Sequence, residues 1–296
     1  MGGNRVLDDQ RELLILLAHC RGIGWKSIHR LIQVDNSLNF LHTTSKDNLR
    51  QILRIHHSNF ERFYVDLHNL SVKKLIHSYN KHNIKILTIF DKEYPPLLKE
   101  IYDPPWVLFA KGKVSLLSHT RMLSIVGTRA PSAYGIHAVK QILPSLIESG
   151  CVIISGLAEG IDTLAHKTAI QNQGYTIAVI AGGFNHIYPA SNVSLAKHIA
   201  SNHLLLSEYP PDVQPRKWQF PMRNRIISGL SKGTFVIEAR QKSGSLITAD
   251  QALSQGRDVF SLPGHVFAPT SEGTNYLIQQ GAKLIMNAND VITEIE

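Results

Sequence analysis

Residues 216–231, RKWQFPMRNRIISGLS, combine side chains that bind a polyanion with side chains that stack on flat rings. The segment holds four cations within ten residues, with two aromatic residues and a proline between them: Arg216, Lys217, Arg223 and Arg225, with Trp218, Phe220 and Pro221. Proteins that bind single strands use this combination, because every linkage carries a charge and every base has a π-face. We therefore predict a surface that grips a charged, flat and flexible ligand. Phe220 is the predicted stacking platform, and the arginines suit forked contacts with phosphates.

The same residues also have structural explanations, which the sequence leaves open. One alternative places Trp218 in the core. Another pairs Arg223 and Arg225 with Glu208 or Glu238 in an ion-pair network, which would withdraw both arginines from a ligand.

The charge of the chain is unevenly distributed. Its 296 residues include 31 basic and 23 acidic residues, a formal net charge of +8. A basic balance favours polyanionic partners. Residues 212–225 hold four cations and one acid, whereas residues 259–296 hold one lysine and four acids. The cationic part therefore coincides with the segment at 216–231.

Composition also indicates where the protein works. Hydrophobic residues make up 43% of the chain, enough for a sizeable core. No apolar stretch approaches the roughly 20 residues that cross a membrane, and the N-terminus lacks the layout of a signal peptide. The two cysteines lie in apolar segments and suggest no disulfide framework. The fifteen histidines are scattered, without HExxH or CxxC. We predict a cytoplasmic protein with no membrane insertion, no metal and no cofactor.

The order of apolar segments predicts the fold. Residues 1–68 have a helical period and are predicted as a small all-α domain. Residues 69–115, with strands at Lys85–Ile89 and Trp106–Ala110, are predicted as a connection and entry strands. The rest, 116–296, alternates helical segments with short apolar runs at 122–126, 151–155, 176–181, 203–207, 234–238 and 258–262. This alternation predicts an α/β, Rossmann-like, doubly wound and mainly parallel sheet.

The N-terminal part contains one further pattern, RGIGWKSIHRLI at 21–32. It resembles a helix-hairpin-helix, in which a glycine-rich turn presents backbone N–H groups to a phosphate. The alternative is a plain turn between two helices of a small bundle.

Small residues follow the predicted strands, where Rossmann-like folds bind their ligands. They are Gly127; Ser155, Gly156 and Gly160; Gly182 and Gly183; and Ser243, Gly244 and Ser245. Such loops suit phosphate binding by backbone N–H groups, and their alternative is an ordinary tight turn. Asp162 has an alternative as an acid at a helix start, and Lys242 as a solvated loop charge. Neither GxGxxG after the first strand of this alternating region nor GxxxxGK[ST] is present, so we predict another type of anion site.

Five motifs in order carry a resemblance to a known family. They are SIVGTRAPSAYG, ISGLAEGIDTLAH, FPMRNRIISGLS, EARQKSGSLITADQALSQGRDVFSLPG and GTNYLIQQGAKLI. Together they resemble the DNA-processing protein A family (DprA, also called Smf) over about residues 85–287. The resemblance implies an extended Rossmann fold that binds single-stranded DNA. The residues implied to line the DNA groove are Arg129, Lys217, Phe220, Arg223, Asn224, Arg225, Lys242, Ser243, Gly244 and Ser245.

The resemblance also implies partners and domains. Family members dimerise and load the RecA recombinase in natural transformation, so we expect a homodimer that protects incoming DNA, with a contact at Tyr276, Leu277 and Ile278. Core packing of a last helix is the alternative for that cluster. Many members carry a C-terminal winged-helix-like domain, and we expect none here. The N-terminal region is similar to the sterile-alpha-motif-like or helix-hairpin-helix-like domains of some members.

Two other function classes compete with this expectation. The first is an enzyme like the lysine-decarboxylase-like phosphoribohydrolases, which carry a PGGxGTxxE pattern. Here SGLSKGTFVIEA has the Gly-Thr pair, but it lacks Pro-Gly-Gly, and Glu238 lies one residue too far along. No nucleophile–base pair is evident, so we predict no catalysis. The second is a scaffold whose basic strip recognises an acidic protein, which predicts no DNA affinity at modest salt.

Overall fold

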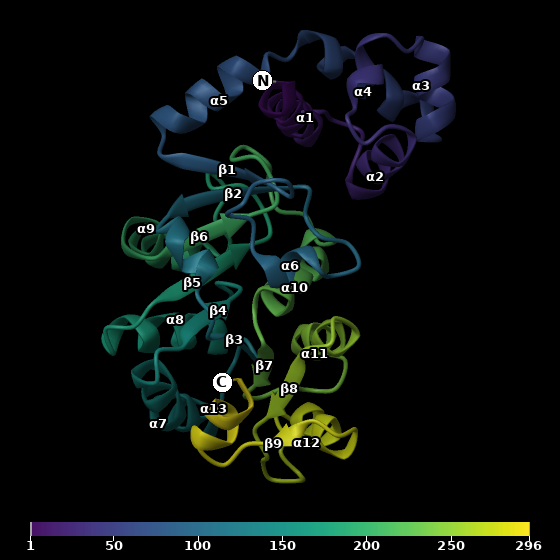
Figure 1. Cartoon of the computed structure of the whole chain (residues 1–296). Coiled ribbons are helices and arrows are strands. Elements are labelled where there is room, and N and C mark those ends of the chain that lie inside the picture. Colours follow the sequence, from purple (N-terminus) through teal and green to yellow (C-terminus); the bar gives the residue numbers. More distant parts are fainter. Residues whose placement is uncertain (1, 296) are drawn as a thin grey trace. The chain divides into compact units, whose positions relative to one another are not determined.

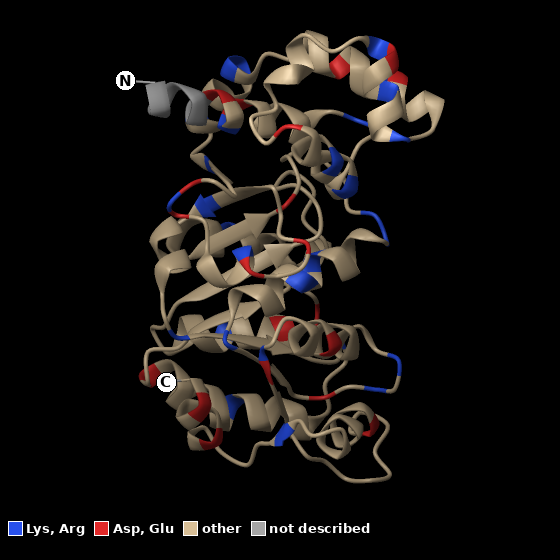
Figure 2. Cartoon of the chain, turned by 45° about the vertical axis from the view of Figure 1, so that its right-hand side comes forward, with Lys and Arg blue, Asp and Glu red and all other residues tan. Residues whose placement is uncertain are grey.

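The computed structural model describes residues 2–295. The chain divides into two compact units, one formed by residues 1–94 with 105–109 and the other by residues 95–104 with 110–296 (Figure 1). Lysine and arginine lie among aspartate and glutamate in both units (Figure 2). The overall distribution of charge therefore does not locate a binding site, and local geometry has to identify it. None of the described helices combines the length and the hydropathy that crossing a membrane requires.

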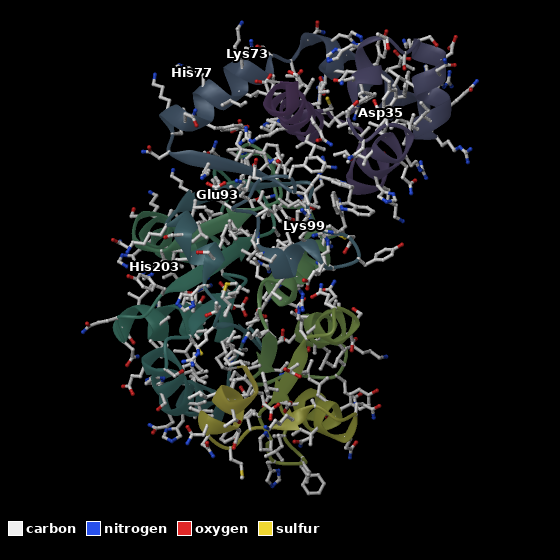
Figure 3. The ribbon with its side chains drawn as sticks, viewed as in Figure 1. Asp35, Lys73, His77, Glu93, Lys99 and His203 are labelled. Carbon is white, nitrogen blue, oxygen red and sulfur yellow. The ribbon has the colours of Figure 1, made fainter. Side chains whose placement is uncertain are left out.

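The first unit is mainly helical. Its elements are α1 (Gly2–His19), α2 (Trp25–Val34), η1 (Asn39–His42), α3 (Lys46–Leu53), α4 (His57–Asn69), α5 (Val72–Lys81), β1 (Ile84–Thr88) and the start of β2 (Val107–Gly112). Serine side chains begin two of the helices: Ser45 accepts a hydrogen bond from the Asn48 amide and Ser71 from the Lys74 amide. Lys73 and His77 lie on the exposed side of α5 (Figure 3).

The turn between α1 and α2 is the RGIG segment. Gly22 has φ +84°, and a Cβ there would lie 2.2 Å from the backbone oxygen of Asn59, so only glycine fits. Asp66 of α4 accepts hydrogen bonds from both the backbone amide and the guanidinium of Arg21. These bonds hold the turn against α4. Phosphate binding by this turn stays a prediction.

The second unit is built on a parallel sheet. Its further strands are β3 (Met122–Val126), β4 (Val152–Ser155), β5 (Thr176–Ile180), β6 (Leu204–Ser207), β7 (Gly233–Val236), β8 (Asp258–Ser261) and β9 (Lys283–Leu284). They lie in the order β6-β5-β4-β3-β7-β8-β9, and each adjacent pair is parallel. The six apolar runs predicted as strands in this region are all strands, and their ends differ by at most two residues.

Helices cover both faces of this sheet. They are α6 (Pro96–Lys99), η2 (Val114–Ser118), α7 (Ala133–Glu148), α8 (Ile161–Gln171), η3 (Ala190–Asn192), α9 (Val193–Asn202), α10 (Gln219–Leu230), α11 (Gly244–Ser254), α12 (Glu272–Gln279) and α13 (Asn289–Ile295). Helices α7, α8 and α9 lie on one face, and α10 and α11 lie on the other (Figure 1). The strands are buried on both sides, as their unbroken apolar sequences require. The predicted α/β, Rossmann-like fold class is confirmed.

Candidate functional site

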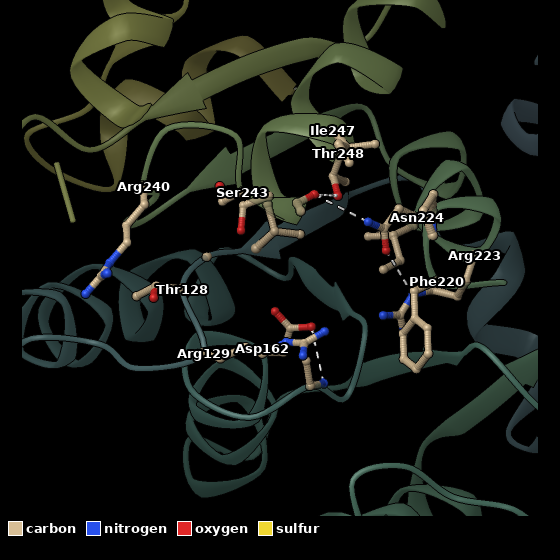
Figure 4. Close-up of a pocket in the computed structure, with 17 residues that line it drawn as sticks. Thr128, Arg129, Asp162, Phe220, Arg223, Asn224, Arg240, Ser243, Ile247 and Thr248 are labelled. Carbon is tan, nitrogen blue, oxygen red and sulfur yellow. Dashed lines mark hydrogen bonds between the residues drawn. The ribbon is translucent and has the colours of Figure 1, made fainter. Parts of the chain in front are cut away.

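The strand order of the second unit reverses at β3. Strands β4, β5 and β6 follow it on one side, and β7, β8 and β9 lie on the other. In open α/β sheets, ligands bind beyond the carboxyl ends of the strands at such a reversal. A pocket of about 340 Å³ lies there, between the loop after β3, the loop after β7, and helices α10 and α11 (Figure 4). We call it the main pocket.

The main pocket brings together most of the predicted groove residues. Those that line it are Arg129, Phe220, Arg223, Asn224, Ser243, Gly244 and Ser245, and Gly127, one of the predicted phosphate-loop residues, lines it as well. Three segments that together span more than a hundred residues of the chain therefore meet at one site. Lys217, Arg225 and Lys242 do not line the pocket. Lys217 and Lys242 are exposed in the loops before α10 and α11.

Helical geometry explains which residues of α10 reach the main pocket. Phe220, Arg223, Asn224 and Ile227 line it, and their spacing of three and four residues is that of one helix face. Arg225 is two positions from Arg223, so it points to the other side of the helix. Two arginines that are separated by one residue in the motif thus have different surroundings.

Arg225 forms a buried ion-pair cluster. Its side chain is only 3% exposed, and its guanidinium lies 2.6 Å from an oxygen of Glu208 and 3.1 Å from one of Asp103. Burial raises the pKa of both carboxyl groups, and Arg225 opposes that rise. The ion pair with Glu208, one of the alternatives stated from the sequence, is therefore present. Arg225 is not available to a phosphate in this arrangement.

Arg223 is also buried, but it faces the main pocket. Its guanidinium donates to the backbone oxygens of Gly156 and Val179 and to the side-chain oxygen of Asn224. Burial lowers its pKa to about 10, so it stays charged at neutral pH. Asn224 in turn donates to the backbone oxygen of Gly244, at 3.4 Å. Arg223 and Asn224 therefore fix the position of the pocket wall.

The loop after β4 does not present a free phosphate cradle. Asp162 is buried, and one of its carboxylate oxygens accepts hydrogen bonds from the amides of Gly156 and Ala158, at 3.1 and 3.3 Å. Burial raises the pKa of Asp162, and the nearby charge of Arg223 opposes the rise. The anion that these amides hold is thus a side chain of the protein itself. The amide of Gly156, which we expected to bind phosphate, therefore already has a partner.

The other predicted loop residues away from the main pocket have packing roles. Ser155 is buried and donates to the backbone oxygen of Ile125. Gly183 is covered by the loop after β6, where a Cβ would lie 2.1 Å from the backbone oxygen of Pro210, and Gly182 packs against Pro215. Gly160 lies against the loop after β3. These glycines permit close packing of loops.

The start of α11 is the polar side of the main pocket. The first amides of a helix have no partner inside the helix, and they carry partial positive charge. Ser243 stands at the N-cap of α11 but caps no amide, and its buried hydroxyl has no hydrogen-bond partner in the described chain. Arg129 and Arg240 are exposed at the mouth, and neither has a carboxylate partner among the described side chains of residues 9–295. This geometry suits an extended anion.

Phe220, which lines the main pocket, contacts a second aromatic ring. Phe220 is half-buried, and its ring makes an edge contact with Tyr188, with centroids 5.7 Å apart. Trp218 is 58% exposed, so the alternative that placed it in the core is wrong. Tyr188 belongs to the loop after β5, which we had interpreted only through its glycines.

Sequence reasoning missed several pocket residues. Arg240 and Thr248 come from the β7–α11 segment, and Thr128 follows Gly127. Arg240 could have been predicted from the sequence, because it lies three residues before Ser243 in a loop that we had already identified as a candidate. Asp162 gave a weaker one, because a carboxylate two residues after a glycine-rich loop is positioned to accept from that loop.

The candidate acid of the enzyme alternative lies outside the main pocket. Glu238, the candidate acid of the enzyme alternative, accepts from the backbone amide and the hydroxyl of Ser132, and it does not line the pocket. Within residues 2–295, no three His, Cys, Asp or Glu side chains are arranged to hold a metal ion. Glu238 therefore holds Ser132 in place at the start of α7.

The predicted dimer residues differ in exposure. Tyr276 is 52% exposed on α12, Leu277 is 3% exposed and belongs to the core, and Ile278 is intermediate. Leu284 of β9 and Met286 are also exposed.

Several known proteins resemble this chain in sequence and in fold. The model of the family described as DNA recombination-mediator protein A matches residues 85–296. DNA processing protein DprA of Bacillus subtilis is 49% identical over 255 residues, covering 86% of this chain and 84% of the relative. Protein Smf of Escherichia coli is 46% identical over 204 residues, which cover 69% of this chain and 54% of the relative.

Two solved structures agree with this. The X-ray structure of DprA from Streptococcus pneumoniae has a TM-score of 0.83 at 38% identity, over 97% of this chain and 98% of that one. DprA from Helicobacter pylori, described with its single-stranded DNA binding mode, has a TM-score of 0.64 at 33% identity, over 71% and 94%. By its motifs, its fold and these matches, the chain belongs to the DNA recombination-mediator protein A family.

Proposed function

We propose that the protein binds single-stranded DNA in the main pocket, protects the strand, and loads a RecA recombinase onto it in natural transformation or recombination. The observation that carries the binding proposal is a combination of groups at one switch point: two exposed arginines without a carboxylate partner in the described part of the chain, a helix N-terminus whose serine hydroxyl has no hydrogen-bond partner there, and Phe220. Cationic and aromatic groups together suit a strand whose bases are unpaired. Most of these contacts reach phosphate, which carries little sequence information.

Arg129 is expected to contribute a phosphate contact. Replacing it with alanine should weaken binding of labelled oligothymidine and reduce the slope of log K against log salt by about 0.7, the value for one phosphate contact on a single strand. Fluorescence anisotropy over a salt series measures both quantities, with a matching duplex as the competing ligand.

The control for Arg129→Ala is Arg121→Ala, because the Arg121 guanidinium donates to the backbone oxygen of Ser149 and does not line the main pocket. Equal binding of single strand and duplex, or an Arg129→Ala slope equal to that of the unaltered protein, contradicts the proposal. Release of free base from AMP would support the phosphoribohydrolase alternative instead.

We also propose a homodimer through α12 and β9. The support is the exposed apolar group of Tyr276, Leu284 and Met286, together with the position of β9 at the end of the strand order. Tyr276→Asp with Leu284→Asp should give a monomer in sedimentation analysis, while Val65→Asp, an exposed valine of the first unit, should not. If the variant with both substitutions, at Tyr276 and Leu284, sediments with the same mass as the unaltered protein, the result contradicts this interface.

The recombinase partner is proposed from family membership. The test is the rate at which RecA forms filaments on a strand already covered by single-strand-binding protein. Addition of this protein should raise that rate, and the Arg129→Ala variant should raise it less. If the protein binds the strand but leaves the rate of filament formation unchanged, then it binds DNA without loading the recombinase.

A further inference from the structure

A second, smaller pocket adjoins the main one. Its wall includes Glu159 and Tyr188, and it shares Arg129, Phe220 and Arg223 with the main pocket. Its volume of about 20 Å³ is too small for a nucleobase. A base at this position must therefore lie across the mouth, where the exposed side chains decide how it is held.

Tyr188 supplies a flat surface at that mouth. Its side chain is 55% exposed, and the edge contact with Phe220 has an angle of 77° between the rings. That contact braces Tyr188 from one side and leaves part of its surface open. A base that follows the one on Phe220 can stack there, since aromatic side chains accept successive bases of a single strand.

Glu159 places a carboxylate beside this surface. One of its oxygens accepts a hydrogen bond from the Ser191 hydroxyl at 3.0 Å, and the side chain has no cationic partner in the part of the chain described. The side chain of Glu159 is exposed, so it is accessible to a ligand. A carboxylate repels phosphate, whereas Arg129, on the wall common to both pockets, attracts it. The strand is thereby oriented with its backbone toward Arg129 and a base edge toward Glu159.

We propose that Tyr188 and Glu159 form a base-reading subsite that favours cytosine over pyrimidines without an exocyclic amine. A carboxylate accepts from cytosine N4, and it faces a repelling carbonyl oxygen at the same position of uracil or thymine. The inference rests on the proposed binding of single-stranded DNA and adds a base preference to contacts that otherwise lack one.

The test compares oligodeoxycytidine with oligodeoxyuridine of equal length, because these bases differ only at C4 and N3. Fluorescence anisotropy above neutral pH should show tighter binding of the cytidine strand, by about three- to tenfold, the range for one hydrogen bond. Glu159→Gln should bring this ratio close to one, because an amide can donate to O4 as well as accept from N4.

Glu148→Gln is the matched control, since it removes the same charge from an exposed glutamate of α7 away from both pockets. It should leave the cytidine-to-uridine ratio unchanged. Tyr188→Ala should weaken both strands. Equal affinities in the unaltered protein, or a ratio that survives Glu159→Gln, overturns the subsite. Failure of both strands to bind at low salt overturns the proposed function itself, so the two failures are distinct.

Discussion

Replacing Arg225 with alanine is expected to lower the free energy of unfolding by about 3–5 kcal/mol, as for other buried ion pairs that lose one partner. Glu208 and Asp103 would then lie near each other without a compensating cation. Affinity for DNA, measured on the folded fraction, should hardly change because Arg225 does not line the main pocket. Urea unfolding followed by circular dichroism measures the free energy.

The pH dependence of that loss has a definite sign. Without Arg225, the folded-state pKa of Glu208 lies further above its unfolded value of about 4.3. A raised pKa means that the folded state binds more protons, so stability falls as pH rises. The deficit of the variant should therefore shrink as pH falls toward about 4. Arg216→Ala, at an exposed arginine, should stay within about 0.5 kcal/mol of the unaltered protein. A small, pH-independent deficit for Arg225→Ala would contradict the buried cluster.

Phe220→Ala is expected to weaken single-strand binding by about 1–3 kcal/mol, the value for loss of one stacked base. This corresponds to a loss of affinity of about five- to 150-fold. Because phenylalanine carries no charge, the salt slope should stay unchanged, unlike that of Arg129→Ala. Anisotropy titrations of both variants over the same salt series separate the two effects.

Two controls define the role of Phe220. Phe220→Leu keeps most of the side-chain volume without a ring face, so it should bind nearly as weakly as the alanine variant. Phe267→Ala removes a highly exposed phenylalanine that lines neither pocket, and it should bind like the unaltered protein. Full affinity of Phe220→Ala, with Arg129→Ala impaired, would show that the strand is held by charge alone.

The strands could be predicted from sequence because a parallel strand covered on both faces is an unbroken apolar run. MLSIV at 122–126 is such a run, and every one of its residues is buried. The order of the strands could not be predicted, since it depends on which crossovers turn to which side. The reversal at β3 decides that the loops after β3 and β7 meet, and it therefore decides the site.

The candidate site was only partly predictable for two physical reasons. The motif FPMRNR reads as one basic cluster along the chain, but on α10 Arg223 and Arg225 face different directions. The glycine-rich loops read as anion cradles, but a carboxylate from the chain itself fills one of them. Local sequence does not show which side of a helix faces its sheet, and it does not show which group accepts from a loop amide.

Asp162 is a ligand from the chain itself for the backbone amides of the loop after β4. A competing anion would have to displace a carboxylate that is tethered to the chain and so always present at a high effective concentration. Free nucleotides in a cell are abundant small anions, and the amides of Gly156 and Ala158 are closed to them. In the proposed binding mode, a long strand would not need those amides, because it would contact Arg129, Arg240 and the start of α11 together. That mode would select ligands by size, because a polymer gains from many contacts, whereas a small anion finds these two amides already paired.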